Sequence, residues 1–221
     1  MSNNKFITNA RMEQITSTIL TNNNLMPSLD KISKIDIDYL IEFGYDLDIV
    51  WDNIDHLSSN DSVVLAAIHP KSKLILMNES RKDIFEKEIG SMNFSKAHEL
   101  GHWVLHVTGD RNYEELTFHD TDRFYCRSKF NRNPIEIQAN MFAASLLMPK
   151  ILIQEYINEL KSYKRVEFKD LYRLKNKLEV SISALVRRIK DLNLLYITDD
   201  GKIFESENEA LGQLKMWIGY T

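Results

Sequence analysis

Residues 96–106 read KAHELGHWVLH and hold three of the six histidines of the chain. His98 and His102 are four residues apart, and Glu99 directly follows the first of them. On a helix of 3.6 residues per turn, positions four apart lie one above the other, so both imidazoles can point at one metal ion. Glu99 lies about 100° further around the helix, close enough to hold a water without taking a coordination position. This pattern predicts a metal-dependent hydrolytic site with Glu99 as general base.

Zinc is the metal that suits this chemistry, because it binds imidazole at about 2.0–2.1 Å and lowers the pKa of a bound water towards about 7. The competing interpretation is a core-packed helix, since an apolar stripe runs along the same segment at Phe94, Ala97, Gly101 and Val104. His106 continues the four-residue series, but it lies about 12 Å along the axis from His98, too far to share its ion. We favour the metal site.

A catalytic zinc usually has three protein ligands and an open fourth position. The segment PIEIQANMFAA offers a third ligand, because Glu136 and Asn140 are four residues apart on one helical face. A glutamate placed in this way can bind the metal while the residue one turn later orients a ligand histidine. Asn133 and Glu136 are also a plausible capping pair, in which the glutamate only satisfies a backbone N–H. The HELGH segment favours the ligand role.

The helices and strands around these segments can be predicted from hydrophobic periodicity and from capping and turn residues. We expect a helix followed by a loop in 8–34, a strand near 45–51, and an antiparallel hairpin around HPKSK in 62–78. A helix should begin near Ser80 and run through HELGH, and a second should follow an Asn133 cap. The strand KLILMN could also cradle an extended substrate, if it lies at the edge of the sheet.

Composition bounds the class of protein. The 221 residues suit one ordinary domain with a small appendage, and the formal charge of −4 argues against a wholesale nucleic-acid binder. The single cysteine, Cys126, fits a reducing cytosol. The first twenty residues lack the apolar core of a signal peptide, and no apolar run approaches the roughly 18 residues of a membrane span. We therefore expect a cytoplasmic protein without a membrane segment.

The C-terminal segment has a different charge. Residues 161–190 carry ten Lys and Arg against three Asp and Glu, a net +7, so the rest of the chain sums to −11. Two helices separated by a turn near Glu179–Ser181, and then a hairpin at Asp200–Gly201, resemble a winged helix. A DNA-reading second helix would carry its basic side chains where this chain has Arg187, Arg188 and Lys190. A solvated surface helix, or a docking face for an acidic protein substrate, explains the charges as well.

FSKAHELGHWVLH, followed about thirty residues later by EIQANMFAASLLMP, resembles the ImmA/IrrE family of zinc metallo-endopeptidases. The hallmark of that family is HELGH plus E-x-x-A-N-x-F-A-x-x-L-L-M-P, and the likeness covers about residues 35–150. The resemblance implies an α+β fold with a minimal gluzincin-like metalloprotease domain. In such a domain a small, mostly antiparallel sheet packs on two zinc-bearing helices.

The resemblance also implies one Zn²⁺ on His98, His102 and Glu136, with Glu99 as general base. Asn140 would support a histidine where many gluzincins have aspartate. Family members with known roles cut a helix-turn-helix repressor and so release genes of mobile elements or of a stress response. Some members carry an N-terminal helix-turn-helix, for which the first 34 residues here are too short.

Three segments are therefore expected: an N-terminal helix or arm at 1–34, a zinc metallopeptidase domain at 35–150 and a helical, winged-helix-like extension at 151–221. The oxyanion of the reaction needs a donor besides the metal. The irregular stretch 107–133 offers three candidates, which the sequence does not rank: His119, Tyr125 and Arg127. The predicted function is zinc-dependent cleavage of a specific protein, a helix-turn-helix repressor. The alternative is a regulatory or DNA-binding protein that binds its partner without cutting it.

Overall fold

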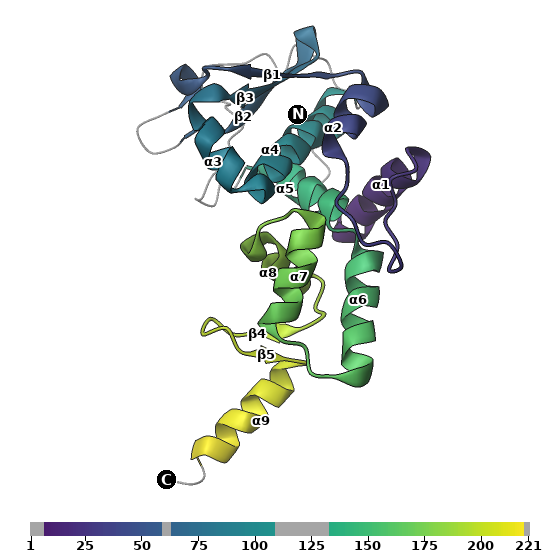
Figure 1. The fold of residues 1–221 in the computed structure, drawn as a ribbon, viewed down its shortest axis with the longest axis vertical. Coiled ribbons are helices and arrows are strands. Elements are labelled where there is room, and N and C mark those ends of the chain that lie inside the picture. The colour runs from purple at the N-terminus through teal and green to yellow at the C-terminus, as the bar shows by residue number, and fades with distance from the viewer. Residues whose placement is uncertain (1–6, 59–62, 109–132, 219–221) are drawn as a thin grey trace.

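The computed structural model describes residues 7–58, 63–108 and 133–218 of the chain (Figure 1). Helices and two small sheets alternate along it, in the mixed α+β arrangement that was predicted. The helices are α1 (Asn9–Asn22), α2 (Ile37–Tyr39), α3 (Lys82–Lys87), α4 (Ile89–His102), α5 (Pro134–Leu147), α6 (Lys150–Tyr163), α7 (Phe168–Leu178), α8 (Ile182–Asp191) and α9 (Glu207–Ile218). The strands are β1 (Asp48–Asp52), β2 (Ala66–His69), β3 (Leu74–Asn78), β4 (Tyr196–Ile197) and β5 (Ile203–Phe204).

The larger sheet has the order β1-β3-β2. Strands β2 and β3 form the predicted antiparallel hairpin, with Ala66 opposite Met77 and His69 opposite Leu74. Strand β1 pairs with β3 in parallel. The expectation of a mostly antiparallel sheet is therefore wrong, because the sheet is mixed. The chain reverses between β1 and β2 and again between β2 and β3, so β1 runs parallel to the strand that it joins.

The KLILMN segment is the central strand, β3, and not an edge. It is hydrogen-bonded to β1 on one side and to β2 on the other. Its backbone groups are therefore used within the sheet, and the idea that this strand receives an extended substrate is wrong. The hydrophobic pattern of β3 is equally compatible with an edge and a centre, because the pairing with β1 depends on a partner more than twenty residues away.

Helix α4 carries HELGH and follows α3 after a break at Glu88, whose φ of −127° and ψ of 69° are not helical. The predicted single helix is therefore divided into two. The predicted start at Ser80 is also different, because α3 begins at Lys82 after a 3₁₀ turn at Glu79–Arg81. Asn78 caps that turn: its Oδ1 accepts hydrogen bonds from the Ser80 N–H and hydroxyl, at 3.2 and 2.9 Å. After His102 the helix continues as a π-helical turn through Val107.

Helix α5 begins as its sequence predicts. Asn133 is the N-cap and its side chain accepts a hydrogen bond from the backbone N–H of Ile135 at 3.0 Å, while Pro134 occupies the first helical position. Helix α5 then packs along α4. The two helices approach closely at Gly101, where an added Cβ would lie 3.0 Å from the ring of the fully buried Phe142.

The turn between α7 and α8 packs against the start of α4. Glu179 adopts the left-handed conformation there, with φ 49°, and its carbonyl accepts a hydrogen bond from the Asn93 side chain at 3.1 Å. A Cβ added to Gly90 would lie 2.5 Å from backbone atoms of Val180 and Ser181. Only glycine allows this contact, so α7 and α8 pack tightly on the helix that carries HELGH.

One cluster of buried apolar side chains extends from Met12 in α1 to Ile203 in β5. Helix α1 contributes to it by packing on α5, and α7 and α8 lie between the sheet-bearing part of the molecule and the β4–β5 hairpin (Figure 1). The division into 1–34, 35–150 and 151–221 stays a prediction. Among the described helices, none is both long and apolar enough to cross a membrane.

Replacing Gly90 by alanine should destabilise the protein by at least about 2 kcal/mol, because backbone atoms of Val180 and Ser181 must move to admit a methyl group. Urea unfolding would measure the loss. Gly212→Ala is the matched control. Its added Cβ meets no atom within 4 Å, so that variant should gain about 0.5–1 kcal/mol from helix propensity. Equal stability of the Gly90→Ala and wild-type proteins would contradict the close packing of α4 on the α7–α8 turn.

Candidate metal centre

His98 and His102 of α4 and Glu136 of α5 meet in the interior. His98 Nε2 lies 3.3 Å from Glu136 Oε2, and His102 Nε2 lies 3.4 Å from Glu136 Oε1. The two Nε2 atoms are 2.9 Å apart. One ligand atom from each of the three residues lies within 4.8 Å of the others, and all three side chains are buried. The residues predicted as ligands are therefore brought together, although Glu136 is more than thirty positions from either histidine in the sequence.

Local geometry and helix packing together produce this cluster. The four-residue spacing of the histidines places both rings on the side of α4 that faces α5. Glu136 lies in the first turn of α5, and its carboxylate contacts the imidazoles instead of capping the helix. Asn133 alone supplies the side-chain cap. The close approach at Gly101 keeps the two helices near enough for these short contacts.

The donor set fits a zinc ion. Tetrahedral coordination with bonds of about 2.0–2.1 Å places ligand atoms about 3.3–3.4 Å apart. The three separations here, 2.9, 3.3 and 3.4 Å, are close to that value. Both oxygens of Glu136 are buried, and each lies 3.3–3.4 Å from the Nε2 atom of one of the two histidines. Two imidazole nitrogens and a carboxylate gathered in the buried interior are a suitable setting for a cation.

Asn140 contacts the cluster from behind. Its Oδ1 lies 3.1 Å from Nδ1 of His98. The tautomer with hydrogen on Nδ1 donates to this oxygen and leaves Nε2, which faces Glu136 and His102, with its lone pair available. The side chain predicted to orient a histidine therefore lies where it can do so, one turn beyond Glu136 on α5.

Glu99 is fully buried in α4, and neither of its carboxylate oxygens has a side-chain hydrogen-bond partner in the described ranges. Burial raises the pKa of Glu99 to about 8, and the negative charge of Glu136 acts in the same direction. Charge on His98 and the backbone N–H of Ile68 in β2 lower this pKa. A cation in the cluster would lower it too, since a nearby positive charge favours the carboxylate form.

The two histidines have opposite pKa shifts. Burial lowers the pKa of His98, but the hydrogen bond with Glu136, the charges of Glu99 and Glu136, and Asn140 outweigh it, and the pKa is raised. The pKa of His102 is well below its usual value because of burial and the charges of His98 and His106. A neutral His102 has a lone pair to offer a metal.

Backbone and neighbouring groups that the sequence did not reveal also shape the centre. Strand β2 packs on α4, and the effect of Ile68 on Glu99 comes from its backbone N–H, which no side-chain pattern records. The ring of His106 lies 5.6 Å from that of His102, and it is not part of the metal-ligating group found among the described residues. The predicted oxyanion donors His119, Tyr125 and Arg127, together with Cys126, lie outside the residues that the structure describes.

The basic helix α8 differs from the expectation of an exposed DNA-reading surface. Arg188 is buried, its Nη2 lies 2.6 Å from Glu13 Oε1 in α1, and its Nε donates to the Met148 carbonyl at 3.0 Å. The idea of Arg188 as a DNA contact is therefore wrong. Arg187 is exposed and pairs with Asp191. The sequence shows a run of basic residues but not which of them meets an acidic residue 175 positions away.

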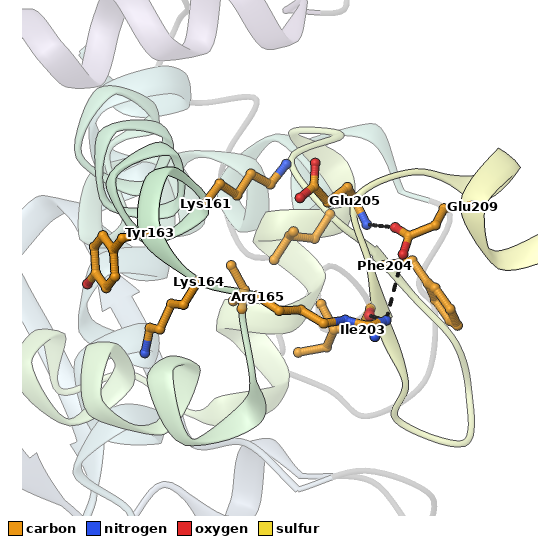
Figure 2. A pocket seen from close by; sticks show the side chains of 10 residues that line it. Lys161, Tyr163, Lys164, Arg165, Ile203, Phe204, Glu205 and Glu209 are labelled. Carbon is orange, nitrogen blue, oxygen red and sulfur yellow. Dashed lines mark hydrogen bonds and ion pairs between the residues drawn. The ribbon is translucent and has the colours of Figure 1, made fainter.

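A separate cleft of about 350 Å³ lies between the end of α6 and the β4–β5 hairpin (Figure 2). Arg165 crosses it, donates a hydrogen bond to the Ile203 carbonyl at 2.9 Å and lies over the Phe204 ring at 5.5 Å. Its guanidinium therefore holds the hairpin against α6. None of the three metal-cluster residues lines this cleft.

Two packed helices that bring two histidines and a glutamate together, beside a small sheet, define a candidate metal centre in an α+β protein. Residues 69–190 match the family Peptidase_M78, the IrrE N-terminal-like domain, and the chain belongs to this family. Membership implies metallopeptidase activity. The match runs from the end of β2 into α8, so it includes α7 and α8 as well as the two helices of the cluster. No curated protein sequence matches the chain significantly.

Replacing Arg188 by methionine should cost about 3 kcal/mol of stability, because it leaves the Glu13 carboxylate and the Met148 carbonyl without their partner in the interior. Arg187→Met, one position earlier, removes only an exposed pair and should change stability by less than about 1 kcal/mol. Thermal unfolding of both variants measures the difference. Similar losses in the two would mean that the buried pair does not hold α1 to α8.

Proposed function

We propose that this protein is a zinc-dependent endopeptidase with one Zn²⁺ on His98, His102 and Glu136. The observation that carries the proposal is the buried cluster itself: three ligands of types that zinc prefers, two imidazoles and a carboxylate, separated by distances close to those in a tetrahedral site. The fully buried Glu99 lies beside it on the same helix. The family to which the chain belongs is one of metallopeptidases.

Zinc in this cluster would supply a Lewis acid for the scissile carbonyl and lower the pKa of the attacking water. Glu99 takes a proton from that water as its oxygen attacks the carbonyl carbon. Glu99 then gives the proton to the leaving nitrogen as the C–N bond breaks, which yields a carboxylate and an amine. Asn140 keeps the His98 ring oriented through its Nδ1 contact during these steps.

Strand β2 is the part of the sheet that would receive an extended substrate in this proposal. It packs on α4, it is hydrogen-bonded to β3 alone among the described strands, and the Ile68 N–H acts on Glu99. A peptide paired along its open edge would bring a carbonyl group near the cluster. The oxyanion donor stays a prediction among His119, Tyr125 and Arg127.

The proposed substrate is a helix-turn-helix transcriptional repressor, whose cleavage would release mobile-element or stress-response genes in the cytoplasm. This part of the proposal rests on the likeness of HELGH and EIQANMFAASLLMP to the ImmA/IrrE motifs. A non-cleaving regulatory protein with the same fold is the competing function. DNA binding through α8 is disfavoured by the burial of Arg188.

The purified wild-type chain should bind about one zinc per molecule. Glu136→Ala should lower zinc affinity by at least about tenfold, because it removes a ligand from the cluster. Elemental analysis and competition with a chelating dye measure content and affinity. The control is Glu155→Ala on the exposed side of α6, which should leave both unchanged. A wild-type protein that takes up no zinc when it is supplied would refute the proposed centre.

Glu99→Gln should lower the turnover number by about 10²–10⁴-fold, because the amide cannot accept the water proton, while zinc content stays at the wild-type level. A peptide library from a whole-cell digest, read by mass spectrometry, would show which bonds the zinc-loaded wild type cuts. Identical cleavage by Glu99→Gln and wild type would remove Glu99 from the mechanism. A partner that both proteins bind and neither cuts would favour the non-cleaving function.

A further inference from the structure

The exposed side of α7 carries a row of three cations. Lys169, Arg173 and Lys177 are spaced four residues apart, so they follow one line on the helix surface, about 6 Å between neighbours. The exposed Tyr172 lies beside this row. The opposite side of α7 is in the core through Leu171, Leu174 and Leu178. The row is therefore presented to solvent by a well-packed helix whose stability does not depend on it.

We propose that this basic row is a docking surface for an acidic segment of a protein partner. The inference rests on the proposed function in one respect: the partner is the protein substrate of the metal centre. Complementary charge favours encounter and register, and the tyrosine adds a flat apolar contact that can hydrogen-bond. The surface would therefore select substrates by a segment that is distant from the scissile bond.

The cations of the row are available to a partner. Lys177 has no ion pair with any described residue, and Lys169 has an exposed pair with Glu167, of the kind that contributes little. Arg173 lies 3.7 Å from Asp170, which is buried and already held by Lys164 at 2.5 Å. A carboxylate from outside would thus compete with weak contacts only.

The row suits an acidic protein segment better than nucleic acid. Three cations are fewer than the roughly 6–10 phosphate contacts of a typical DNA-binding surface, and the chain outside residues 161–190 has a net charge of −11. The turn that leads into α8, whose N-terminal residues a DNA-reading helix would direct at the bases, packs against α4 at Gly90 through Val180 and Ser181. Arg188 is unavailable because it is buried against α1.

The row also lies within reach of the metal cluster. Helix α7 ends at the turn that contacts Gly90, and Gly90 and His98 are eight residues apart on α4, about 12 Å along the axis. Lys177 is three residues before Val180, and α7 ends between them, so the two are at most about 10 Å apart. An extended chain advances about 3.3 Å per residue, so about seven or more residues can connect a segment docked on the row to a bond at the cluster. Figure 1 shows α7 below α4 and α5.

Binding of a fluorescein-labelled peptide of twelve glutamates to the full Glu99→Gln chain tests the proposal by anisotropy, independently of catalysis. We expect binding at 20 mM salt that weakens as salt increases, because screening shortens the reach of exposed charges. The triple variant Lys169→Glu/Arg173→Glu/Lys177→Glu should bind the peptide at least tenfold more weakly than the parent chain does. The control Lys31→Glu/Lys71→Glu/Lys87→Glu reverses three other exposed lysines, changes net charge equally and should bind as the parent does.

Equal loss in the two triple variants, or no binding by the parent chain at low salt, would overturn the proposal. Tighter binding of a random DNA duplex that the α7 variant abolishes would assign the row to nucleic acid instead, and also overturn it. A parent chain that self-associates through the row, shown by sedimentation, would identify the partner as a second copy and contradict the substrate role. Failure of zinc uptake with intact peptide binding would refute only the proposed function.

Discussion

The structure depends on one close contact between two helices, α4 and α5, at Gly101 and Phe142. Glycine has no Cβ, so the ring of Phe142 lies directly over the α4 backbone between Glu99 and His102. The resulting short distance between the helices is what places Glu136 within 3.3–3.4 Å of the imidazoles. A larger residue at 101 would push α5 away and open the cluster even with all three ligands intact. The five residues HELGH therefore supply both the reactive side chains and, through Gly101, the room that α5 needs to approach them.

Burying the cluster also lowers the stability of the folded protein. Two carboxylates, Glu99 and Glu136, and two imidazoles are taken out of water together, and burial of such groups is unfavourable without charge compensation. The raised pKa of Glu99 and the lowered pKa of His102 have the same cause, because each group shifts towards its neutral form. A bound divalent cation would offset the two negative charges, and metal binding and stability should then be coupled.

The features that could be predicted from the sequence are those that depend on residues close together in the chain. The histidine spacing, the Asn133 cap and the turn at Glu179 depend on residues a few positions apart, and the structure has all three. The central position of β3 depends on its pairing with β1, and the burial of Arg188 depends on Glu13 at the other end of the chain. No local pattern encodes either. Glu136 was predicted because a catalytic zinc needs a third ligand and Glu136 and Asn140 share a helical face, and the ImmA/IrrE motif pointed to the same residue.

Net charge in a sequence segment is consequently a poor guide to what that segment binds. The ten cations of 161–190 divide, once folded, into different physical roles. Arg188 is buried and forms an ion pair with Glu13 of α1. Arg165 donates a hydrogen bond to the Ile203 carbonyl in the β4–β5 hairpin, and Lys164 forms an ion pair with the buried Asp170. The row on α7, Lys169, Arg173 and Lys177, is exposed and keeps its charge at the surface. Because Gly90 of α4 packs against Val180 and Ser181 in the turn between α7 and α8, the helix-turn-helix outline of this segment supports the metal-bearing helix.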